Sequence, residues 1–267
     1  MDEMQSLVQL YSLRDKTAVI TGAAAGMGLA TARRFAEAGA NLLLLDVNAE
    51  LLQTLPEKIR LRHGWMKTVE IDLAQKEEID AFWHSLRDTE YPDVLINNAG
   101  IFPFRDFLET DQEFVQQVMD VNLNAAYWLC QHFVRQRLAV KKSGSIVNVG
   151  SIEAQLPFKE DLAHYTTGKA AVIALTRALA RDYGRFNIRA NVILPGGILT
   201  EGVKSASKQV LKDPKLIKDG FYFKSRLPLG RFGDPDEVAR VTLMLATDIC
   251  SYMNGAVIPI DGGFLSA

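Results

Sequence analysis

The chain has 267 residues, of which 48% are hydrophobic and 23% are charged, and its formal net charge is −2. This length suits one large α/β domain or two small ones. The near balance of charge argues against a nucleic-acid partner, which would require a strongly basic surface.

The sequence also indicates where the protein works. No apolar stretch approaches the roughly 20 residues that a membrane span needs, and the acidic N-terminus lacks the apolar core of a secretory signal. Cys130 and Cys250 lie far apart and form no CxxC motif, which is typical of buried thiols in a reducing compartment. We therefore expect a cytoplasmic protein with no membrane contact.

Seven short apolar runs alternate with helical stretches along the chain. The runs cover residues 17–20, 41–46, 65–71, 93–97, 145–149, 188–193 and 256–260. Several are continuously apolar, as in parallel strands that are covered on both faces. The alternation predicts an α/β fold, a doubly wound parallel sheet of about seven strands with helices on both faces, in one domain over 1–267. Residues 200–227 interrupt the rhythm, and we expect them to form a substrate-side insertion.

The first apolar run ends in a glycine-rich segment, TGAAAGMG (21–28), that leads directly into a predicted helix. Gly22, Gly26 and Gly28 allow positive φ and a close approach of the backbone to a ligand. The helix N-terminus beyond them offers free N–H groups and a positive dipole end, which suit a pyrophosphate. The spacing differs from GxGxxG, so a turn that serves only tight strand–helix packing is the alternative.

The second apolar run ends in Asp46, some eighteen residues after Gly28. A carboxylate at this place can accept hydrogen bonds from both hydroxyls of an adenosine ribose, and it would repel a 2′-phosphate. No Arg or Lys occurs among residues 47–49, and Ala25 precedes Gly26. The sequence therefore predicts NAD rather than NADP. An acid at a helix N-terminus is the plainer reading of Asp46, and it is compatible with this role.

Two further loops follow predicted strands. Asp72 and Leu73 come after the third run, where they could meet an adenine, and Asn97-Asn98-Ala99-Gly100 comes after the fourth. In open parallel sheets ligands bind at the carboxyl ends of the strands. These loops could thus line a cofactor groove, or simply hydrogen-bond to neighbouring loops.

Residues 165–169 read YTTGK inside a stretch that is expected to be helical. Four residues are about one helical turn, so Tyr165 and Lys169 leave the same face. The pattern alone is loose, and it equally fits a surface helix that carries a tyrosine and a lysine.

Taken in order, these motifs resemble those of the short-chain dehydrogenase/reductase family, from about Leu13 to Phe264. The matching features are TGAAAGMG (21–28), Asp46, Asp72-Leu73, NNAG (97–100), Asn122, Ser151, YTTGK (165–169), PGGILT (195–200) and DGG (261–263). The resemblance implies a single Rossmann domain that transfers hydride between a nicotinamide and a secondary alcohol or ketone.

The resemblance also implies roles for individual residues. It implies a catalytic group of Asn122, Ser151, Tyr165 and Lys169. The implied cofactor contacts for NAD are Gly22, Gly26, Met27, Gly28, Asp46, Asp72, Leu73, Asn98, Ala99, Gly100, Tyr165, Lys169, Pro195, Gly196, Ile198 and Thr200. The gap between Ser151 and Tyr165 is one residue longer than is usual in the family.

The expected chemistry centres on a phenol. A free phenol has a pKa near 10, and the ammonium of Lys169 is expected to lower the pKa of Tyr165. Tyr165 would then take or give the alcohol proton, and Ser151 would hold the substrate oxygen. Asn122 would hold a water that links Lys169 to solvent.

The substrate is less well defined by the sequence. Glu153, Phe158 and His164 lie between the serine and the tyrosine and are candidate substrate contacts, as are the aromatic residues 221–223 of the insertion. This mixture could suit a polyol, a sugar, a hydroxy acid or a cyclic alcohol. The remaining histidines show no ligand spacing, so we predict no metal.

Two rival functions stay open, and assembly is expected. One rival is an NADPH-linked 3-oxoacyl-thioester reductase, and the other is a protein that senses NADH without turnover. The helical run 111–138 is apolar on more than one face, which is typical of a helix that is buried twice. In the family such helices pair across a dimer, so we expect a homotetramer or a homodimer.

Overall fold

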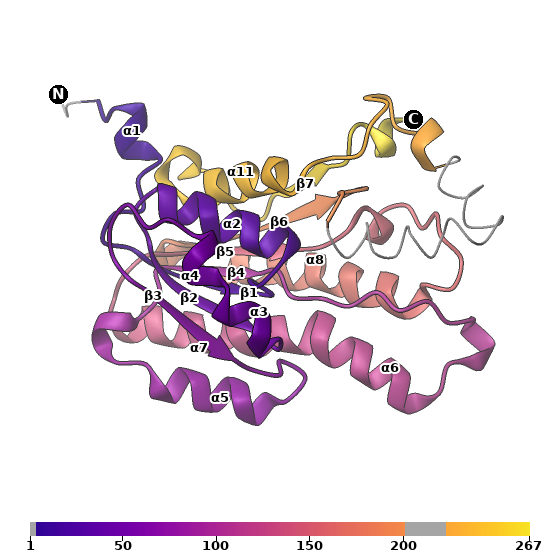
Figure 1. Ribbon diagram of the computed structural model, residues 1–267, viewed down its shortest axis with the longest axis horizontal. Helices are drawn as coiled ribbons and strands as arrows, with labels where there is room; N and C mark the ends of the chain where they lie inside the picture. The colour runs from indigo at the N-terminus through magenta and orange to yellow at the C-terminus, as the bar shows by residue number, and fades with distance from the viewer. Residues whose placement is uncertain (1–3, 201–222) are drawn as a thin grey trace.

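The computed structural model describes residues 4–200 and 223–267. Within these ranges the strands are β1 (Thr17–Thr21), β2 (Asn41–Asp46), β3 (Met66–Glu70), β4 (Val94–Asn97), β5 (Gly144–Val149), β6 (Ile188–Pro195) and β7 (Val257–Ile260). They form one seven-stranded sheet in the order β3-β2-β1-β4-β5-β6-β7, and every neighbouring pair is parallel (Figure 1). The predicted doubly wound parallel sheet is confirmed. Its strand order reverses between β1 and β4, which is where ligands bind in such sheets.

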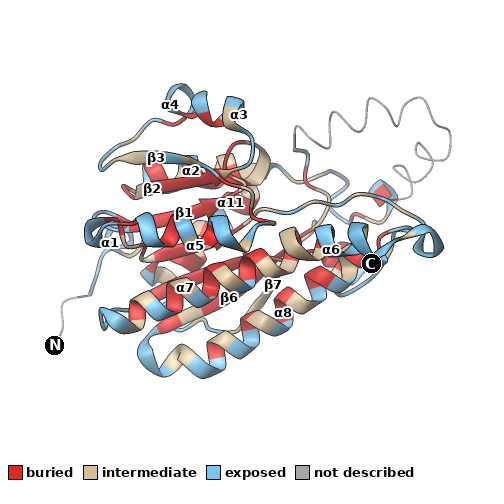
Figure 2. Cartoon of the chain, turned by 90° about the horizontal axis from the view of Figure 1, so that it is seen from below, coloured by how far each residue is buried: buried red, intermediate tan, exposed pale blue. Residues whose placement is uncertain are grey.

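Helices cover both faces of the sheet. The longer ones are α2 (Gly26–Glu37), α5 (Lys76–Ser85), α6 (Gln112–Met119), α7 (Ala125–Ala139), α8 (Ala163–Tyr183) and α11 (Pro235–Ala246), and the short ones are α1 (Leu7–Leu10), α3 (Ala49–Gln53) and α4 (Leu55–Lys58). α2 and α11 lie on one face, and α5, α7 and α8 lie on the other (Figure 1). Each helix turns its buried stripe towards the sheet and its polar side outwards (Figure 2).

The strands are apolar because both of their faces are covered. In β2 the four consecutive leucines 42–45 are all fully buried. Leu42 and Leu44 belong to the core beneath α2, whereas Leu43 and Leu45 belong to the core beneath α5 and α7, as the alternation of side chains along a strand requires. Burial stabilises the fold by about 1.5–3 kcal/mol for each such side chain. The edge strand β3 instead carries exposed polar residues such as Lys67, which discourages pairing with another chain.

Local sequence signals fix the helix ends. Asp234 and Glu237 form a capping box at the start of α11, and Pro235 occupies its first position. Arg34 of α2 then pairs through two nitrogens with the carboxylate of Asp236, at 2.6 and 2.7 Å. This fork joins the two helices that cover the same face of the sheet.

Two sequence expectations need comment. The run 111–138 is not one continuous helix, because a π-helical turn at Asp120–Asn124 separates α6 from α7. The insertion predicted at 200–227 falls mostly outside the described residues, as do two of its aromatic residues, Phe221 and Tyr222. Phe223 is described, and it is buried against Phe158 and Phe264.

Candidate active site

The glycine loop joins β1 to α2 at the carboxyl edge of the sheet. Gly22 and Gly26 have φ of 60° and 54°, a region that glycine enters readily. A Cβ on Gly28 would lie 2.0 Å from the carbonyl oxygen of Gly22, so this turn admits no side chain there. The N-cap residue Ala25 makes no side-chain cap, which leaves the first N–H groups of α2 available to an anion. Met27, in the same turn, packs against the core.

Asp46 ends β2 directly beside this loop. Its Oδ2 accepts the N–H of Ala24 at 2.9 Å, and its Oδ1 accepts the N–H of Asn48 at 3.0 Å. The carboxylate is thus held at the rim of the glycine loop with lone pairs to spare. A small, side-chain-free cradle at a helix N-terminus, with a carboxylate beside it, fits the pyrophosphate and ribose of a dinucleotide.

The loop 97–100 is fastened to the glycine loop through Thr21, a residue that sequence reasoning did not single out. Its Oγ1 accepts the N–H groups of Asn98 and Ala99, both at 3.0 Å. Asn98 Nδ2 in turn donates to the carbonyls of Thr21 and Gly22, at 2.9 and 3.1 Å. The only signal in the sequence was a hydroxyl residue at the end of an otherwise apolar strand.

The predicted catalytic residues Asn122 and Lys169 meet at Gly100. A Cβ on Gly100 would lie 2.8 Å from Asn122 Oδ1 and 3.2 Å from Lys169 Nζ. Asn122 lies in the π-helical turn, and its amide forms two hydrogen bonds with the backbone of Ile101, at 2.9 and 2.8 Å. A π-helical turn is frequent at functional sites. The role of Asn122 in holding a water stays a prediction.

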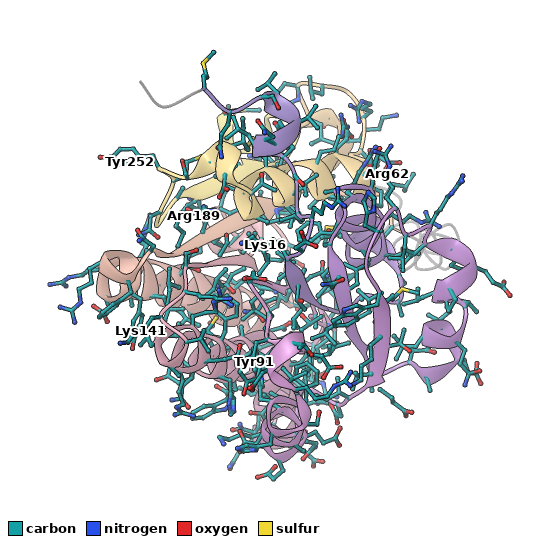
Figure 3. All side chains as sticks on the ribbon, turned by 90° about the vertical axis from the view of Figure 1, so that its left-hand side faces the viewer. Lys16, Arg62, Tyr91, Lys141, Arg189 and Tyr252 are labelled. Carbon is teal, nitrogen blue, oxygen red and sulfur yellow. The ribbon has the colours of Figure 1, made fainter. Side chains whose placement is uncertain are left out.

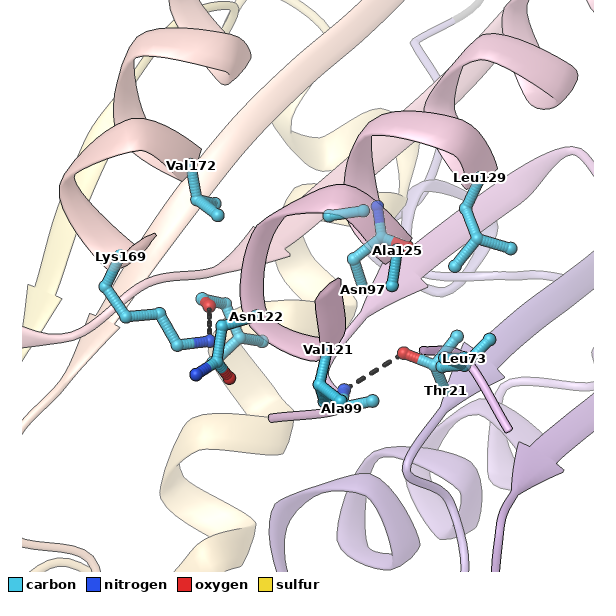
Figure 4. A pocket seen from close by; sticks show the side chains of 12 residues that line it. Thr21, Leu73, Asn97, Ala99, Val121, Asn122, Ala125, Leu129, Lys169 and Val172 are labelled. Carbon is cyan, nitrogen blue, oxygen red and sulfur yellow. Dashed lines mark hydrogen bonds between the residues drawn. The ribbon is translucent and has the colours of Figure 1, made fainter. Parts of the chain in front are cut away.

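Lys169 extends from α8 into the protein interior. Its side chain is only 4% exposed, and Nζ donates to the carbonyl of Val149 at 2.9 Å. A cavity of about 10 Å³ lies beside it, lined by residues that include Thr21, Leu73 and Asn122 (Figure 4). Desolvation lowers the pKa of the ammonium to about 8.

Ser151 and Tyr165 complete the predicted group. Ser151 follows β5, its Oγ accepts the N–H of Glu153 at 3.2 Å, and its side chain hydrogen-bonds to Tyr165. Lys169 Nζ lies 5.9 Å from the centre of the Tyr165 ring. The structure thus brings all four predicted catalytic residues to the carboxyl ends of β4 and β5.

The phenol does not have the acidity that the sequence suggested. Burial raises the pKa of Tyr165, the hydrogen bond with Ser151 opposes that rise, and the charge of Glu153 adds to it. The prediction that Lys169 lowers the phenol pKa is therefore wrong for the polypeptide alone. The physical reason is that desolvation penalises the phenolate more than its neighbours stabilise it.

The remaining predicted cofactor residues lie around the same edge. Pro195 ends β6, and a Cβ on Gly196 would lie 2.8 Å from the Cα of Asp261. Ile198 forms a bridge with Gly233. Thr200 approaches the glycine loop, because a Cβ on Gly26 would lie 3.3 Å from its Cγ2.

Asp72 lies after β3, where its Oδ1 accepts the N–H of Ala74 at 2.9 Å. Leu73, the next residue, is buried and lines the small cavity beside Lys169.

The three candidate substrate residues differ in surroundings. Glu153 is buried in a 3₁₀ turn, Ile152–Ala154. Phe158 is half-buried, with its ring centre 4.6 Å from that of Phe264. The imidazole of His164 lies 2.7 Å from the carbonyl of Pro103 and packs edge-on against Phe114, so it ties α8 to the loop after β4. Their contact with a substrate stays a prediction.

Other site types were sought in the described parts of the chain. Residues 4–200 and 223–267 contain no group of three or more His, Cys, Asp or Glu that could hold a metal. No helix in these ranges has the length and apolarity to cross a membrane. Cys130 and Cys250 are free and buried, and desolvation raises the pKa of the Cys130 thiol to about 12.

Comparison with known proteins agrees with this geometry. A family model described as Enoyl-(Acyl carrier protein) reductase matches residues 22–265. The L-rhamnose-1-dehydrogenase of Scheffersomyces stipitis is 34% identical, over 94% of this chain and 96% of that protein. The NAD-dependent glycerol dehydrogenase of Listeria innocua is 32% identical, over 95% of each chain. A 3-oxoacyl-[acyl-carrier-protein] reductase of Chlamydia trachomatis is also 32% identical, over 94% and 98%.

Solved structures match over nearly the full length. A short-chain type dehydrogenase/reductase from Mycobacterium marinum superposes with a TM-score of 0.88 at 29% identity, covering 98% of this chain and 100% of that one. A 4-hydroxyisoleucine dehydrogenase complexed with NADH gives 0.83 at 31% identity, covering 94% and 99%. A provisionally named 2-deoxy-d-gluconate 3-dehydrogenase from Agrobacterium tumefaciens with bound NADP gives 0.84 at 30% identity, covering 97% and 99%.

Fold, site and relatives together define a Rossmann-fold oxidoreductase that uses a nicotinamide cofactor and acts on a secondary alcohol or ketone. The chain belongs to the short-chain dehydrogenase/reductase family, as its motifs indicated.

Proposed function

We propose that this protein is an NAD-dependent dehydrogenase that oxidises a secondary hydroxyl of a polyol or sugar to the corresponding carbonyl. The observation that carries the proposal is the convergence of Ser151, Tyr165 and Lys169 beside the glycine loop and Asp46. The names of two relatives, an L-rhamnose and a glycerol dehydrogenase, support the substrate class.

The proposed chemistry assigns one task to each side chain. Ser151 donates a hydrogen bond to the substrate oxygen, which positions the carbon that loses hydride. Tyr165 takes the hydroxyl proton as general base, and Lys169 stabilises the phenolate with its ammonium. The nicotinamide, when bound, supplies the acceptor for the hydride. Because burial raises the phenol pKa, oxidation is expected to speed up towards alkaline pH.

Asp46 supports NAD over NADP as the cofactor. Its carboxylate is held at the glycine loop by the N–H groups of Ala24 and Asn48, where it would accept ribose hydroxyls and repel a 2′-phosphate. The relatives include both an NAD-dependent enzyme and a structure with bound NADP, so the preference has to be measured on this chain.

The second candidate is an NADPH-linked reductase of 3-oxoacyl thioesters. It is favoured by the resemblance to a 3-oxoacyl-[acyl-carrier-protein] reductase. The carboxylate of Asp46 speaks against it, because a 2′-phosphate would meet like charge there.

The test is NADH or NADPH formation by the purified protein at mildly alkaline pH. The panel contains L-rhamnose, glycerol, galactitol, hydroxy acids and cyclic alcohols. We expect kcat/KM to be at least about 10-fold higher with NAD⁺ than with NADP⁺. Tyr165→Phe should lower kcat by about 100-fold or more, because general acid–base catalysis contributes at least that much. Tyr183→Phe, at the far end of α8, is the matched control and should leave kcat unchanged.

Each alternative has its own outcome in this experiment. Turnover that survives Tyr165→Phe would remove the tyrosine as the acid–base group. A preference for NADPH with an acetoacetyl thioester would support the reductase instead. Tight NADH binding without turnover of any compound would indicate a sensor. We further propose a cytoplasmic location and a homotetramer or homodimer, for which the half-exposed Tyr127 of α7 offers an apolar contact.

A further inference from the structure

Glu153 is a buried acid that the catalytic chemistry does not use. Its residue is only 3% exposed, and its Oε1 has no hydrogen-bond partner among the residues that the structure describes. A carboxylate oxygen buried without a donor is costly, because it has lost water and gained nothing in exchange. Such an atom calls for an explanation.

Part of the side chain has a structural task. Its Oε2 accepts the backbone N–H of Phe158 at 3.2 Å, which closes the turn that follows the catalytic serine. One oxygen is sufficient for this task. The turn therefore explains why an acceptor stands at position 153, but it does not explain the second, unpartnered oxygen.

The position of Glu153 relates it to the reacting atoms. It lies two residues after Ser151, and its backbone N–H donates to Ser151 Oγ at 3.2 Å. Its charge acts on the phenol of Tyr165, so the carboxylate lies near the hydroxyl that exchanges a proton with the substrate. A substrate oxygen held by Ser151 and Tyr165 would thus have this acid as a neighbour.

We infer that Oε1 of Glu153 is the acceptor for a second substrate hydroxyl, on the carbon next to the one that reacts, and that the site thereby selects vicinal diols. The inference rests on the proposed function and narrows its substrate class. A diol O–H supplies the donor that the buried oxygen lacks, whereas a simple secondary alcohol leaves it unpaired. Sites built to bond a substrate hydroxyl reject analogues without it far more strongly than apolar pockets reject a missing methylene.

The experiment compares matched substrates and matched variants. The diols are butane-2,3-diol, glycerol, galactitol and L-rhamnose, and the mono-alcohols are butan-2-ol and cyclohexanol. For the wild type we expect kcat/KM to be at least about 100-fold higher for the best diol than for either mono-alcohol.

Two variants separate the two oxygens. Glu153→Gln keeps a carbonyl oxygen for the N–H of Phe158 but removes the charge, so the diol/mono-alcohol ratio should fall about 10-fold. Glu153→Leu removes both acceptors, and the ratio should fall about 100-fold. Glu160→Gln, an exposed acid seven positions along the chain, loses the same charge and should leave the ratio unchanged. The ratio is insensitive to a changed acidity of Tyr165, because that change affects both substrates alike.

The outcomes separate this inference from the proposed function. Equal losses for diols and mono-alcohols would reduce Glu153 to a brace for the turn and overturn the inference, while dehydrogenase activity stands. The same holds if the wild type oxidises mono-alcohols as well as diols. Absence of turnover with every alcohol, in protein that binds NADH, would overturn the proposed function together with the inference.

Discussion

Lys169 is a charged side chain placed where almost no water reaches it. Burial lowers its pKa from 10.5 to about 8, and a lowered lysine pKa means that the folded state penalises the charged form. Below pH 8 both folded and unfolded chains hold the proton, so the penalty is fully present. Between pH 8 and 10.5 the unfolded chain still holds the proton that the folded chain has lost, so stability rises with pH.

Removal of the ammonium should therefore remove this pH dependence. Between pH 7 and 10.5 the free energy of unfolding of the wild type should rise relative to that of Lys169→Met, by about 3 kcal/mol at most. Urea unfolding at several pH values measures the difference, from which the lost hydrogen bond to Val149 cancels. Lys142→Met, at an exposed lysine, should show no such trend, and a flat difference for Lys169→Met would contradict the lowered pKa.

At the scale of elements, the ends of the strands matter more than their middles. Thr21 closes β1 and accepts two backbone N–H groups of the loop after β4. Thr21→Val keeps the shape and leaves both donors without a partner, so we expect a loss of about 2 kcal/mol or more in stability and weaker NADH binding. Thermal unfolding and fluorescence titration measure the two effects. Thr17→Val, at the opposite end of the same strand, should have the smaller effect, since its hydroxyl makes only one hydrogen bond, at 3.5 Å.

The sequence was informative for elements whose cause is local. The apolar runs predicted all seven strands to within two residues at either end, because burial on both faces leaves few polar positions in them. The π-helical turn was missed because the contact of its Asn122 is with Ile101, twenty-one residues away in the chain. The acidity of Tyr165 was wrong for the same reason: its burial is set by several distant segments, and no short stretch of sequence contains that information.

The whole molecule separates its tasks between the two ends of the sheet. All the predicted site residues that the structure describes lie towards the carboxyl ends, whereas the amino ends carry structural ion pairs. Figure 3 looks onto this amino edge, where Lys16 and Tyr91 precede β1 and β4. Arg137 of α7 is 3% exposed there and binds Asp93 at 3.0 Å and the carbonyl of Ser143 at 2.8 Å.

Arg137→Met should consequently lower stability without changing catalysis. It leaves a buried carboxylate and a carbonyl without their partner, and we expect a loss of about 3–5 kcal/mol in the free energy of unfolding. At a temperature where the variant stays folded, kcat should equal that of the wild type. Arg135→Met, on the exposed side of the same helix, should change neither quantity. A large fall in kcat for folded Arg137→Met would show that the two ends are coupled.

The π-helical turn between α6 and α7 makes the length of this segment as important as its composition. Removal of one residue from Asp120–Asn124 would restore a regular helix and rotate everything beyond it by about 100°. The stripe of α7 that faces the sheet, from Ala125 to Arg137, would then turn towards its neighbours, and Asn122 would leave the backbone of Ile101. The chain can therefore absorb many substitutions here, but a deletion of a single codon would shift a whole helix out of phase with the sheet that it covers.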